Sequence, residues 1–283
     1  MCRFTLYLGP PIRLSSLVTE PKNSLIHQSY QSSEREEPLN GDGFGVAWYA
    51  PEMHEEPALF RSITPAWNNA NLLDLARVVQ SPCILAHVRA ATRVGTISEA
   101  NCHPFRWGPL SFMHNGDVAG FAALRRPLLD ELSDAAFQAI QGTTDSEHVF
   151  ALFIDSFLAA GGERTSAALG QAMRRTLQRI VDLAERYGDG QDSYLNMALS
   201  DGRCAVVTRF TTKADFAGES LYVDRGRSFV CEEGVCRMVD PEPGGGALLV
   251  SSEALSEDPS WEAVPRNHML VIGEDHSVSA EAL

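Results

Sequence analysis

The chain has 283 residues, of which 44% are hydrophobic and 21% charged, and this ordinary globular composition excludes a disordered or fibrous protein. Its 23 basic and 37 acidic residues give a formal net charge of −14. Such a charge repels polyanions, so we expect neither nucleic acid nor an anionic membrane surface as a partner. Because an architecture built on large sheets often reaches this length as one unit, we expect a single domain over residues 1–283.

The N-terminal segment does not resemble a targeting signal. Its apolar stretch is broken early by Pro10 and Pro11, and no run of 18 apolar residues follows in the sequence. We therefore expect a cytoplasmic protein whose cysteines are reduced thiols. The six cysteines, which have neither the spacing of a disulfide framework nor a CxxC pair, are Cys2, Cys83, Cys102, Cys204, Cys231 and Cys236.

Apolar runs and helical spacing predict a mixed chain. In chain order, the predicted elements are strands at 3–8, 44–49 and 58–63, a helix at 68–80, strands at 83–88 and 110–114, helices at 132–140, 145–160 and 164–187, and strands at 194–200, 203–210, 221–223, 247–252 and 268–272. The first strand ties down an end that would otherwise fray, and Pro82 ends the first helix. Strands at both ends with helices between them predict an α+β domain in which sheets stack and helices cover the outside.

Cys2 is a candidate N-terminal nucleophile. Cytosolic aminopeptidases remove Met1 before a small side chain, which would leave a free α-amine beside the thiol. With a pKa near 7.7 to 8.0, this amine is partly neutral at physiological pH and can accept the thiol proton directly or through one water. Nucleophile and base would then come from one residue, as they do with N-terminal threonine. From its position alone, Cys2 is more readily explained as an ordinary early residue.

Three further segments supply groups that a glutamine-like substrate needs. Arg89, at the end of an apolar strand, offers a bidentate fork for an α-carboxylate, or else forms a structural ion pair. Asn115 and Gly116 follow the strand at 110–114, where the Asn115 amide and the Gly116 N–H can form an oxyanion hole, or where Asn-Gly makes a tight turn. Asp145 can pair with a substrate ammonium, or it caps the helix that starts there.

Other motifs favour simpler interpretations. The glycine-rich loop at 40–45 lacks the GxGxxG spacing and the following βαβ pattern of a nucleotide site. His87 and His114 lie in apolar strands, where we expect hydrogen-bonded core histidines rather than ligands. The sequence has no HExxH motif, so we expect neither a metal nor a cofactor. The residues that a zinc site would have to use are Cys102, His103, Cys231 and Cys236.

Six motifs occur in a fixed order: MCRF, NGDGFGVAWY, HVRAAT, NCHPF, FMHNG and TTDSE. Together they resemble the class II glutamine amidotransferases, strongly over residues 1 to 160 and again in the C-terminal segment, which is similar to stand-alone members of that family. Within the family, the motifs are most similar to the amidotransferase-like subunit of the fungal glutathione-degrading complex and its bacterial relatives. They are next most similar to the γ-glutamyl hydrolase of the ergothioneine pathway.

The resemblance implies the N-terminal nucleophile hydrolase fold, a four-layer αββα sandwich of two mainly antiparallel sheets. It also implies a role for each matched residue. Cys2 is the nucleophile, Asn115 and Gly116 form the oxyanion hole, Arg89 clamps the α-carboxylate, Asp145 pairs with the ammonium, and Thr92, Asp42 and Gly43 line the glutamyl pocket.

The activity that this family implies is cleavage of a γ-glutamyl amide bond in a small molecule. Members that make a product carry or recruit a synthetase, for which this chain has no room, so ammonia would be lost to water. We therefore expect a hydrolase of glutamine, of a glutathione-like compound or of another γ-glutamyl compound. The alternative is a glutaminase-type subunit whose partner supplies the ammonia acceptor or a peptidase activity. A degenerate member kept as a ligand-binding module is a third possibility.

Overall fold

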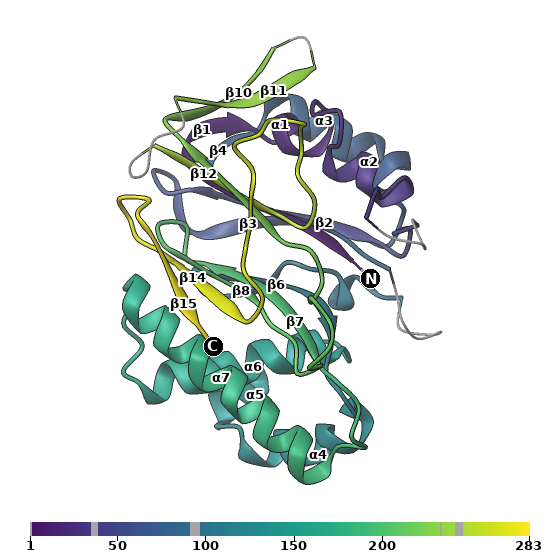
Figure 1. The fold of residues 1–283 in the computed structure, drawn as a ribbon, viewed down its shortest axis with the longest axis vertical. Coiled ribbons are helices and arrows are strands. Elements are labelled where there is room, and N and C mark those ends of the chain that lie inside the picture. The colour runs from purple at the N-terminus through teal and green to yellow at the C-terminus, as the bar shows by residue number, and fades with distance from the viewer. Residues whose placement is uncertain (1, 35–38, 91–96, 233, 241–245) are drawn as a thin grey trace.

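The structure is a computed structural model, and it describes residues 2–34, 39–90, 97–232, 234–240 and 246–283. Two antiparallel sheets lie on top of each other, with helices on both outer faces (Figure 1). The upper sheet has the order β13 (Glu262–Ala263), β9 (Tyr222–Gly226), β12 (Ala247–Ser251), β1 (Arg3–Arg13), β4 (Gln80–Val88), β2 (Phe44–Ala50) and β3 (His54–Ser62). The lower sheet has the order β15 (Val278–Ala282), β14 (His268–Ile272), β8 (Ala205–Arg209), β7 (Tyr194–Ser200), β6 (Leu110–Asp117) and β5 (Phe105–Trp107).

The helices form the two outer layers. Those above the upper sheet are α1 (Ser15–Val18), α2 (Leu25–Tyr30) and α3 (Ala70–Val78), and a small hairpin of β10 (Ser228–Glu232) and β11 (Val235–Val239) lies beside them. Those below the lower sheet are α4 (Phe121–Glu131), α5 (Asp134–Gln138), α6 (Asp145–Ala159) and α7 (Ser166–Tyr187). Two short 3-10 turns, Ala66–Asn68 and Glu99–Asn101, complete the elements of the described residues. The α+β prediction with stacked sheets is confirmed.

The core is divided among the three interfaces of these four layers. In β1, Phe4, Leu6 and Leu8 face the lower sheet, whereas Tyr7 packs under the upper helices. Because successive side chains of a strand point to opposite faces, a strand buried on both faces is apolar throughout, which is why this segment was recognisable in the sequence. Tyr49 ties the two sheets together, since its hydroxyl donates to the carbonyl oxygen of Ser200 at 2.9 Å.

Several predicted boundaries are wrong in an instructive way. The helix expected at 68–80 ends at Val78, and Pro82 lies inside β4 rather than before it. The strand expected at 110–114 continues to Asp117. The helices α1, α2 and α4 were not predicted, and the helix expected at 132–140 is confined to Asp134–Gln138. The helices predicted at 145–160 and 164–187 are confirmed within two residues at each end.

The expectation that all cysteines are reduced thiols is wrong for one pair. Cys231 and Cys236 are joined in a disulfide, whereas Cys2, Cys83, Cys102 and Cys204 are free. The two bonded residues face each other across the β10–β11 hairpin, with 4.1 Å between their Cα atoms. Framework spacing could not reveal this pair, because it is the hairpin register that brings the two sulfur atoms together.

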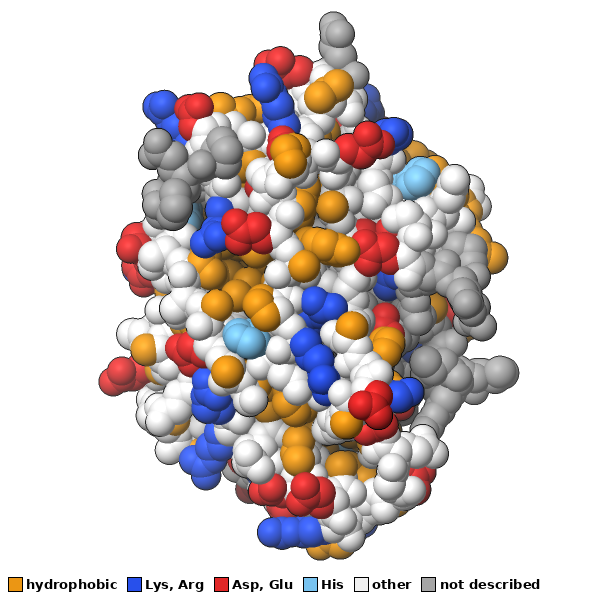
Figure 2. Space-filling view, in the orientation of Figure 1, with side chains coloured by type: hydrophobic (Ala, Val, Ile, Leu, Met, Phe, Trp, Pro, Cys, Tyr) orange, Lys and Arg blue, Asp and Glu red, His pale blue; other side chains and the backbone are white. Residues whose placement is uncertain are grey.

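The surface carries both signs of charge. On the described part of the face drawn in Figure 2, acidic and basic side chains are interspersed and form no large patch of one sign. None of the helices within the described ranges is long and apolar enough to cross a membrane.

Candidate active site

The candidate site lies where strand ends of the two sheets meet. In the upper sheet, Arg3 pairs with Val88 of β4, and Val88 pairs in turn with Phe44 of β2. The residues next to these positions, Cys2, Arg89 and Gly43, are therefore neighbours at one end of this sheet.

The lower sheet adds the end of β6. The ring of His87 in β4 lies with Nε2 3.3 Å from the carbonyl oxygen of His114 in β6. Because Arg89 and Asn115 follow these two histidines along their strands, this contact between the sheets brings Asn115 to the same end as Arg89 and Cys2.

Cys2 lies at the start of β1 with a partly exposed side chain, and its Sγ is 3.7 Å from the carbonyl oxygen of Ala90. Burial raises the pKa of the Cys2 thiol above its ordinary value. The positive charge of Arg89 lowers this pKa and the negative charge of Asp145 raises it, so both groups act on the sulfur electrostatically. The thiol is therefore neutral at physiological pH and needs a base to become a nucleophile.

Arg89 is held by the glycine-rich loop. Its backbone N–H donates to the carbonyl oxygen of Gly43 at 2.8 Å, and the N–H of Asp42 donates to the carbonyl oxygen of Arg89 at 3.0 Å. Gly43 has a φ of +115°, and a Cβ there would lie 2.7 Å from Sγ of Cys102 and 2.8 Å from the carbonyl oxygen of Ser62. This position therefore requires glycine. Arg89 itself is only 5% exposed.

Asn115 and Gly116 lie inside β6 and pair with Asn196 and Leu195 of β7, so the alternative of a tight turn is wrong. Asn115 is completely buried, and no described residue forms a hydrogen bond with either polar atom of its amide. An amide buried without partners is costly and is typical of functional positions. Gly116 has a φ of +144°, and a Cβ there would lie 1.7 Å from the carbonyl oxygen of Tyr194, which excludes any other residue.

Asp145 is the first residue of α6, but it is not the helix cap. The hydroxyl of Thr144 accepts the capping hydrogen bond from the N–H of Glu147 at 3.3 Å. The carboxylate of Asp145 instead accepts from the N–H of Val118 at 3.0 Å and from the N–H of Ser146 at 2.8 Å. Its orientation is therefore fixed by backbone just beyond β6. Thr92, the other predicted pocket residue, lies outside the described residues.

A buried ion pair behind Cys2 was not predicted from the sequence. Arg3 and Glu253 have side-chain exposures of 0% and 1%, and Nε of Arg3 donates to the Glu253 carboxylate at 2.6 Å. Nη1 of Arg3 donates to the carbonyl oxygen of Cys2 at 3.0 Å, and Nη2 donates to the hydroxyl of Ser32 at 3.0 Å. Burial alone would raise the pKa of Glu253, but the Ser32 hydroxyl and Arg3 outweigh it and lower that pKa. The pair thus positions the backbone of Cys2.

Three histidines lie behind the site, and two of them confirm the prediction of hydrogen-bonded core histidines. His87 contacts the carbonyl oxygen of His114, and Nδ1 of His114 lies 2.9 Å from the hydroxyl of Ser146. The third, His103, packs against His87 with 4.2 Å between the ring centroids and an angle of 32° between the ring planes. Burial lowers the pKa of His87 to about 3, and it also lowers the pKa values of His103 and His114. All three rings are therefore neutral at physiological pH.

Comparison with known proteins settles the family. The description "Glutamine amidotransferases class-II" matches residues 17–281. The chain belongs to the class II glutamine amidotransferases. It is 42% identical to the "Probable glutamine amidotransferase DUG3" of Saccharomyces cerevisiae, over 96% of this chain and 82% of the yeast protein. It is 26% identical to the "Gamma-glutamyl-hercynylcysteine sulfoxide hydrolase" of Mycolicibacterium smegmatis, over 98% of each chain.

Among solved structures, a glutamine aminotransferase class-II domain protein from Silicibacter pomeroyi is similar with a TM-score of 0.68 and 26% identity, over 100% of this chain and 99% of that one. The four layers of this amidotransferase are therefore those of the N-terminal nucleophile hydrolase fold, as the motifs implied.

Proposed function

We propose that this amidotransferase hydrolyses a γ-glutamyl amide bond with Cys2 as its nucleophile. The observation that carries the proposal is that Cys2, Arg89 and Asn115 meet at one end of the two sheets, with the Asp145 carboxylate held by the backbone just beyond β6. A γ-glutamyl substrate has an α-carboxylate and an α-ammonium on one carbon. Arg89 matches the first group and Asp145 the second, so the substrate would be held with its γ-carbonyl near the sulfur.

The chemistry would begin after removal of Met1. The free α-amine of Cys2 accepts the thiol proton, and the thiolate attacks the γ-carbonyl carbon. The resulting oxyanion is stabilised by the Asn115 amide and the Gly116 N–H. The leaving amine takes the proton from the α-ammonium as its bond to carbon breaks, which leaves a glutamyl thioester on Cys2. Water, deprotonated by the same amine, then releases glutamate and restores the thiol. We further propose that Asp42, Gly43 and Thr92 line the glutamyl pocket.

The names of two relatives support this choice of substrate. One relative is named as a hydrolase of a γ-glutamyl compound and another as a probable glutamine amidotransferase. A glutaminase-type subunit with a peptidase or synthetase partner is the alternative, and the 42% identity to a protein named as an amidotransferase favours it. Co-purification of a partner from native extract, followed by assay of the chain alone and with that partner, distinguishes the two.

The test of the proposal is glutamate release from glutamine, glutathione and a γ-glutamyl alkylamine. Intact mass first establishes that Met1 is absent from the sample. We expect the processed protein to release glutamate, and Cys2→Ala to release none while its circular dichroism spectrum stays unchanged. Cys204→Ala is the matched control, because Cys204 is a free cysteine in the turn between β7 and β8, away from the proposed site. Substantial turnover by Cys2→Ala would exclude the mechanism.

A further inference from the structure

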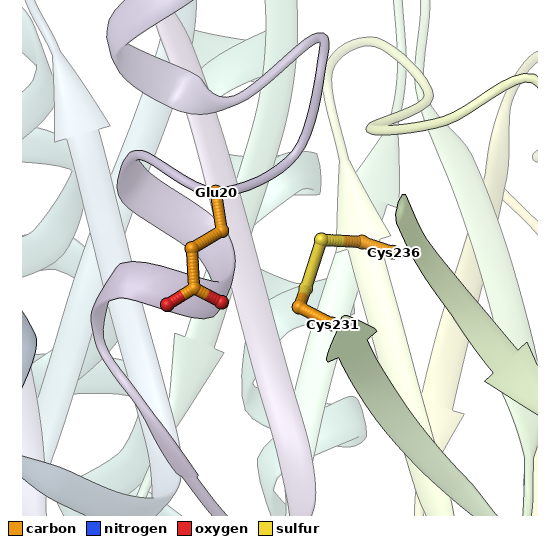
Figure 3. Close-up of side chains that lie close together, drawn as sticks. All are labelled: Glu20, Cys231 and Cys236. Carbon is orange, nitrogen blue, oxygen red and sulfur yellow. A yellow bond between two sulfur atoms is a disulfide. The ribbon is translucent and has the colours of Figure 1, made fainter. Parts of the chain in front are cut away.

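The disulfide of the β10–β11 hairpin has an acidic neighbour from another part of the chain. Glu20, in the loop after α1, lies beside the Cys231–Cys236 bond (Figure 3). One carboxylate oxygen of Glu20 and the two sulfur atoms all lie within 4.8 Å of one another. Within the described part of the chain, this is the group of His, Cys, Asp and Glu side chains that is close enough to share a metal ion.

Two of the three residues, Glu20 and Cys231, border a cavity of about 470 Å³. Its lining includes Glu20 and Cys231 together with Arg13, Ser16 and Gln80. Glu20 and Cys231 are partly exposed, whereas Cys236 is buried at 4% exposure. A small ion can therefore reach the group from solvent without any rearrangement of the core.

The carboxylate is already held in place by a neighbouring hydroxyl group, and one sulfur lies in contact with a backbone carbonyl. The Ser15 hydroxyl donates to Oε1 of Glu20 at 2.6 Å, which orients the carboxylate as the partners of metal-binding carboxylates usually do. Sγ of Cys231 lies 3.6 Å from the carbonyl oxygen of Ser16. The backbone pairing of the hairpin places Cys231 and Cys236 directly opposite each other.

We propose that, once the disulfide is reduced, Cys231, Cys236 and Glu20 form a zinc site at this hairpin. Zinc prefers thiolate and carboxylate ligands at about 2.0–2.3 Å in a tetrahedral arrangement, which places the ligand atoms roughly 3.5–4 Å apart. The three side chains therefore need only shift by about 1 Å, and water fills the fourth position.

Most of the charge at the site is compensated. Two thiolates and one carboxylate carry three negative charges, Zn²⁺ supplies two positive ones, and the exposed guanidinium of Arg13 lines the same cavity. A charge in a partly buried site is stable only when it is compensated in this way.

The reaction that opens the site is a reduction by a dithiol. Two electrons and two protons from the dithiol convert the Cys231–Cys236 bond to two thiols, and the dithiol itself becomes a disulfide. Binding of Zn²⁺ then forms two Zn–S bonds and one Zn–O bond and releases the two thiol protons.

The site is separate from the proposed catalytic centre. Arg13 is the last residue of β1 and Arg3 the first, so the length of this strand, roughly 30 Å, lies between the zinc site and Cys2. Zinc here would not act on substrate. It would join the hairpin to the loop after α1. Under reducing conditions, the metal would bridge Cys231 and Cys236 in place of the disulfide that joins them under oxidising conditions.

The experiment measures zinc binding by the whole chain in both redox states. The protein is reduced with dithiothreitol and desalted without oxygen, and Zn²⁺ is then added and quantified after dialysis. Co²⁺ serves as a second probe, because thiolate ligands give it a charge-transfer absorption. All measurements are made in the Cys2→Ser background, which removes the other partly exposed thiol.

We expect one Zn²⁺ per reduced chain and none on the oxidised chain. Cys231→Ser and Cys236→Ser should each abolish binding, whereas Cys204→Ser should retain it. Glu20→Gln should weaken binding by at least about tenfold, the usual effect of losing even an indirect contact to a metal. Two outcomes overturn the proposal: a reduced chain that binds no more zinc than the Cys231→Ser variant, or a Glu20→Gln variant that binds as tightly as the parent. Because Glu20 lies in a partly exposed loop, the second comparison stands even where a cysteine variant folds poorly.

Discussion

Arg3 makes the position of Cys2 depend on residues far along the chain. Its guanidinium holds the carbonyl oxygen of Cys2 and is itself held by Glu253 in a fully buried ion pair. Removal of one partner leaves an uncompensated buried charge, which typically costs about 3–5 kcal/mol. We therefore expect Glu253→Gln to lower the free energy of unfolding by about this amount and to lower kcat, as measured by urea denaturation and glutamate release.

The matched control for this prediction is an exposed ion pair. Lys22 and Glu257 are in contact at 2.7 Å, but their side chains are 81% and 86% exposed. Solvent screens such a pair, so Glu257→Gln should leave both the unfolding curve and the activity unchanged. Equal behaviour of the Glu253 and Glu257 variants would contradict the role given to Arg3.

A substitution at Asn115 can distinguish an effect on catalysis from an effect on stability. Since no described residue bonds to its amide, Asn115→Ala should cost little hydrogen-bond energy, whereas loss of an oxyanion donor should lower kcat by about 10²- to 10³-fold with KM nearly unchanged. Steady-state kinetics and thermal denaturation of the same sample check both expectations.

Asn196, which pairs with Asn115 across β6 and β7, is the control. Its amide donates to the carbonyl oxygens of Glu219 and Ser220 at 3.1 and 3.2 Å. Asn196→Ala should therefore lose stability and keep most of its kcat. A reversal of the two patterns would place the oxyanion hole elsewhere.

Among the helices, the N-terminus of α6 matters most for the site, because the cap Thr144 and the proposed ammonium partner Asp145 are consecutive residues. Thr144→Ala removes the capping hydrogen bond and should lower the free energy of unfolding by about 1 kcal/mol. Because Asp145 is next in the chain, the KM for a γ-glutamyl substrate should rise as well.

The N-terminus of α7 has the same kind of threonine cap, but no proposed site residue follows it in the chain. The hydroxyl of Thr165 accepts from the N–H of Ala168 at 3.2 Å. Thr165→Ala should show a similar loss of stability with an unchanged KM. A rise in KM for both variants would mean that the loss of overall stability, rather than a displacement of Asp145, raises KM.

The elements that the sequence predicted well are those with strong local patterns. Strands buried on both faces and the long helices α6 and α7 follow from apolar periodicity. The helix α4 was missed because Pro127 lies inside it, where proline removes a backbone donor and ordinarily ends a helix. The end of β6 was placed too early because Asn-Gly is a common turn sequence, and only the pairing with β7 shows that the strand continues.

The residues of the candidate site also divide into those that local motifs predicted and those that only contacts distant in sequence reveal. Cys2, Arg89, Asn115 and Asp145 were predicted from motifs, and the structure brings these four together at one end of the sheets. Glu253 could not be predicted, since its partner Arg3 lies 250 residues away and nothing in the local sequence marks the pair. His103 was noted in a loop motif and as a residue that a zinc site would have to use, and its packing against His87 depends on contact between that loop and β4.

At the scale of the whole molecule, the three neutral histidines behind the site link its stability to pH. Burial lowers their pKa values when the protein folds, whereas in the unfolded chain they return to about 6.5. Their contribution to stability is therefore fully present above pH 6.5 and is lost as the pH falls, continuing to about pH 3 for His87. Each histidine contributes a slope of up to about 1.4 kcal/mol per pH unit.

We expect the free energy of unfolding to fall steadily between about pH 6.5 and 5, a window above the titration of ordinary carboxylates. Urea denaturation across this range measures the slope. His103→Phe removes one titrating ring while keeping an aromatic side chain against His87 and Phe105, so its slope should be smaller by up to about 1.4 kcal/mol per pH unit. A parent protein of constant stability over this window would show that the rings are not buried in their neutral form.

The central place of β1 in the upper sheet has a consequence for the order in which the protein matures. β1 lies between β4 and β12, and its pairing of Thr5 with Ser251 joins residues 246 positions apart. Contacts of such long sequence separation form slowly, because the chain must first close a large loop. On the ribosome, the residue proposed to carry out the chemistry is synthesised long before β12 and Glu253, which complete its surroundings. A nascent chain would therefore carry an exposed thiol without a working active site until β12 and Glu253 have emerged.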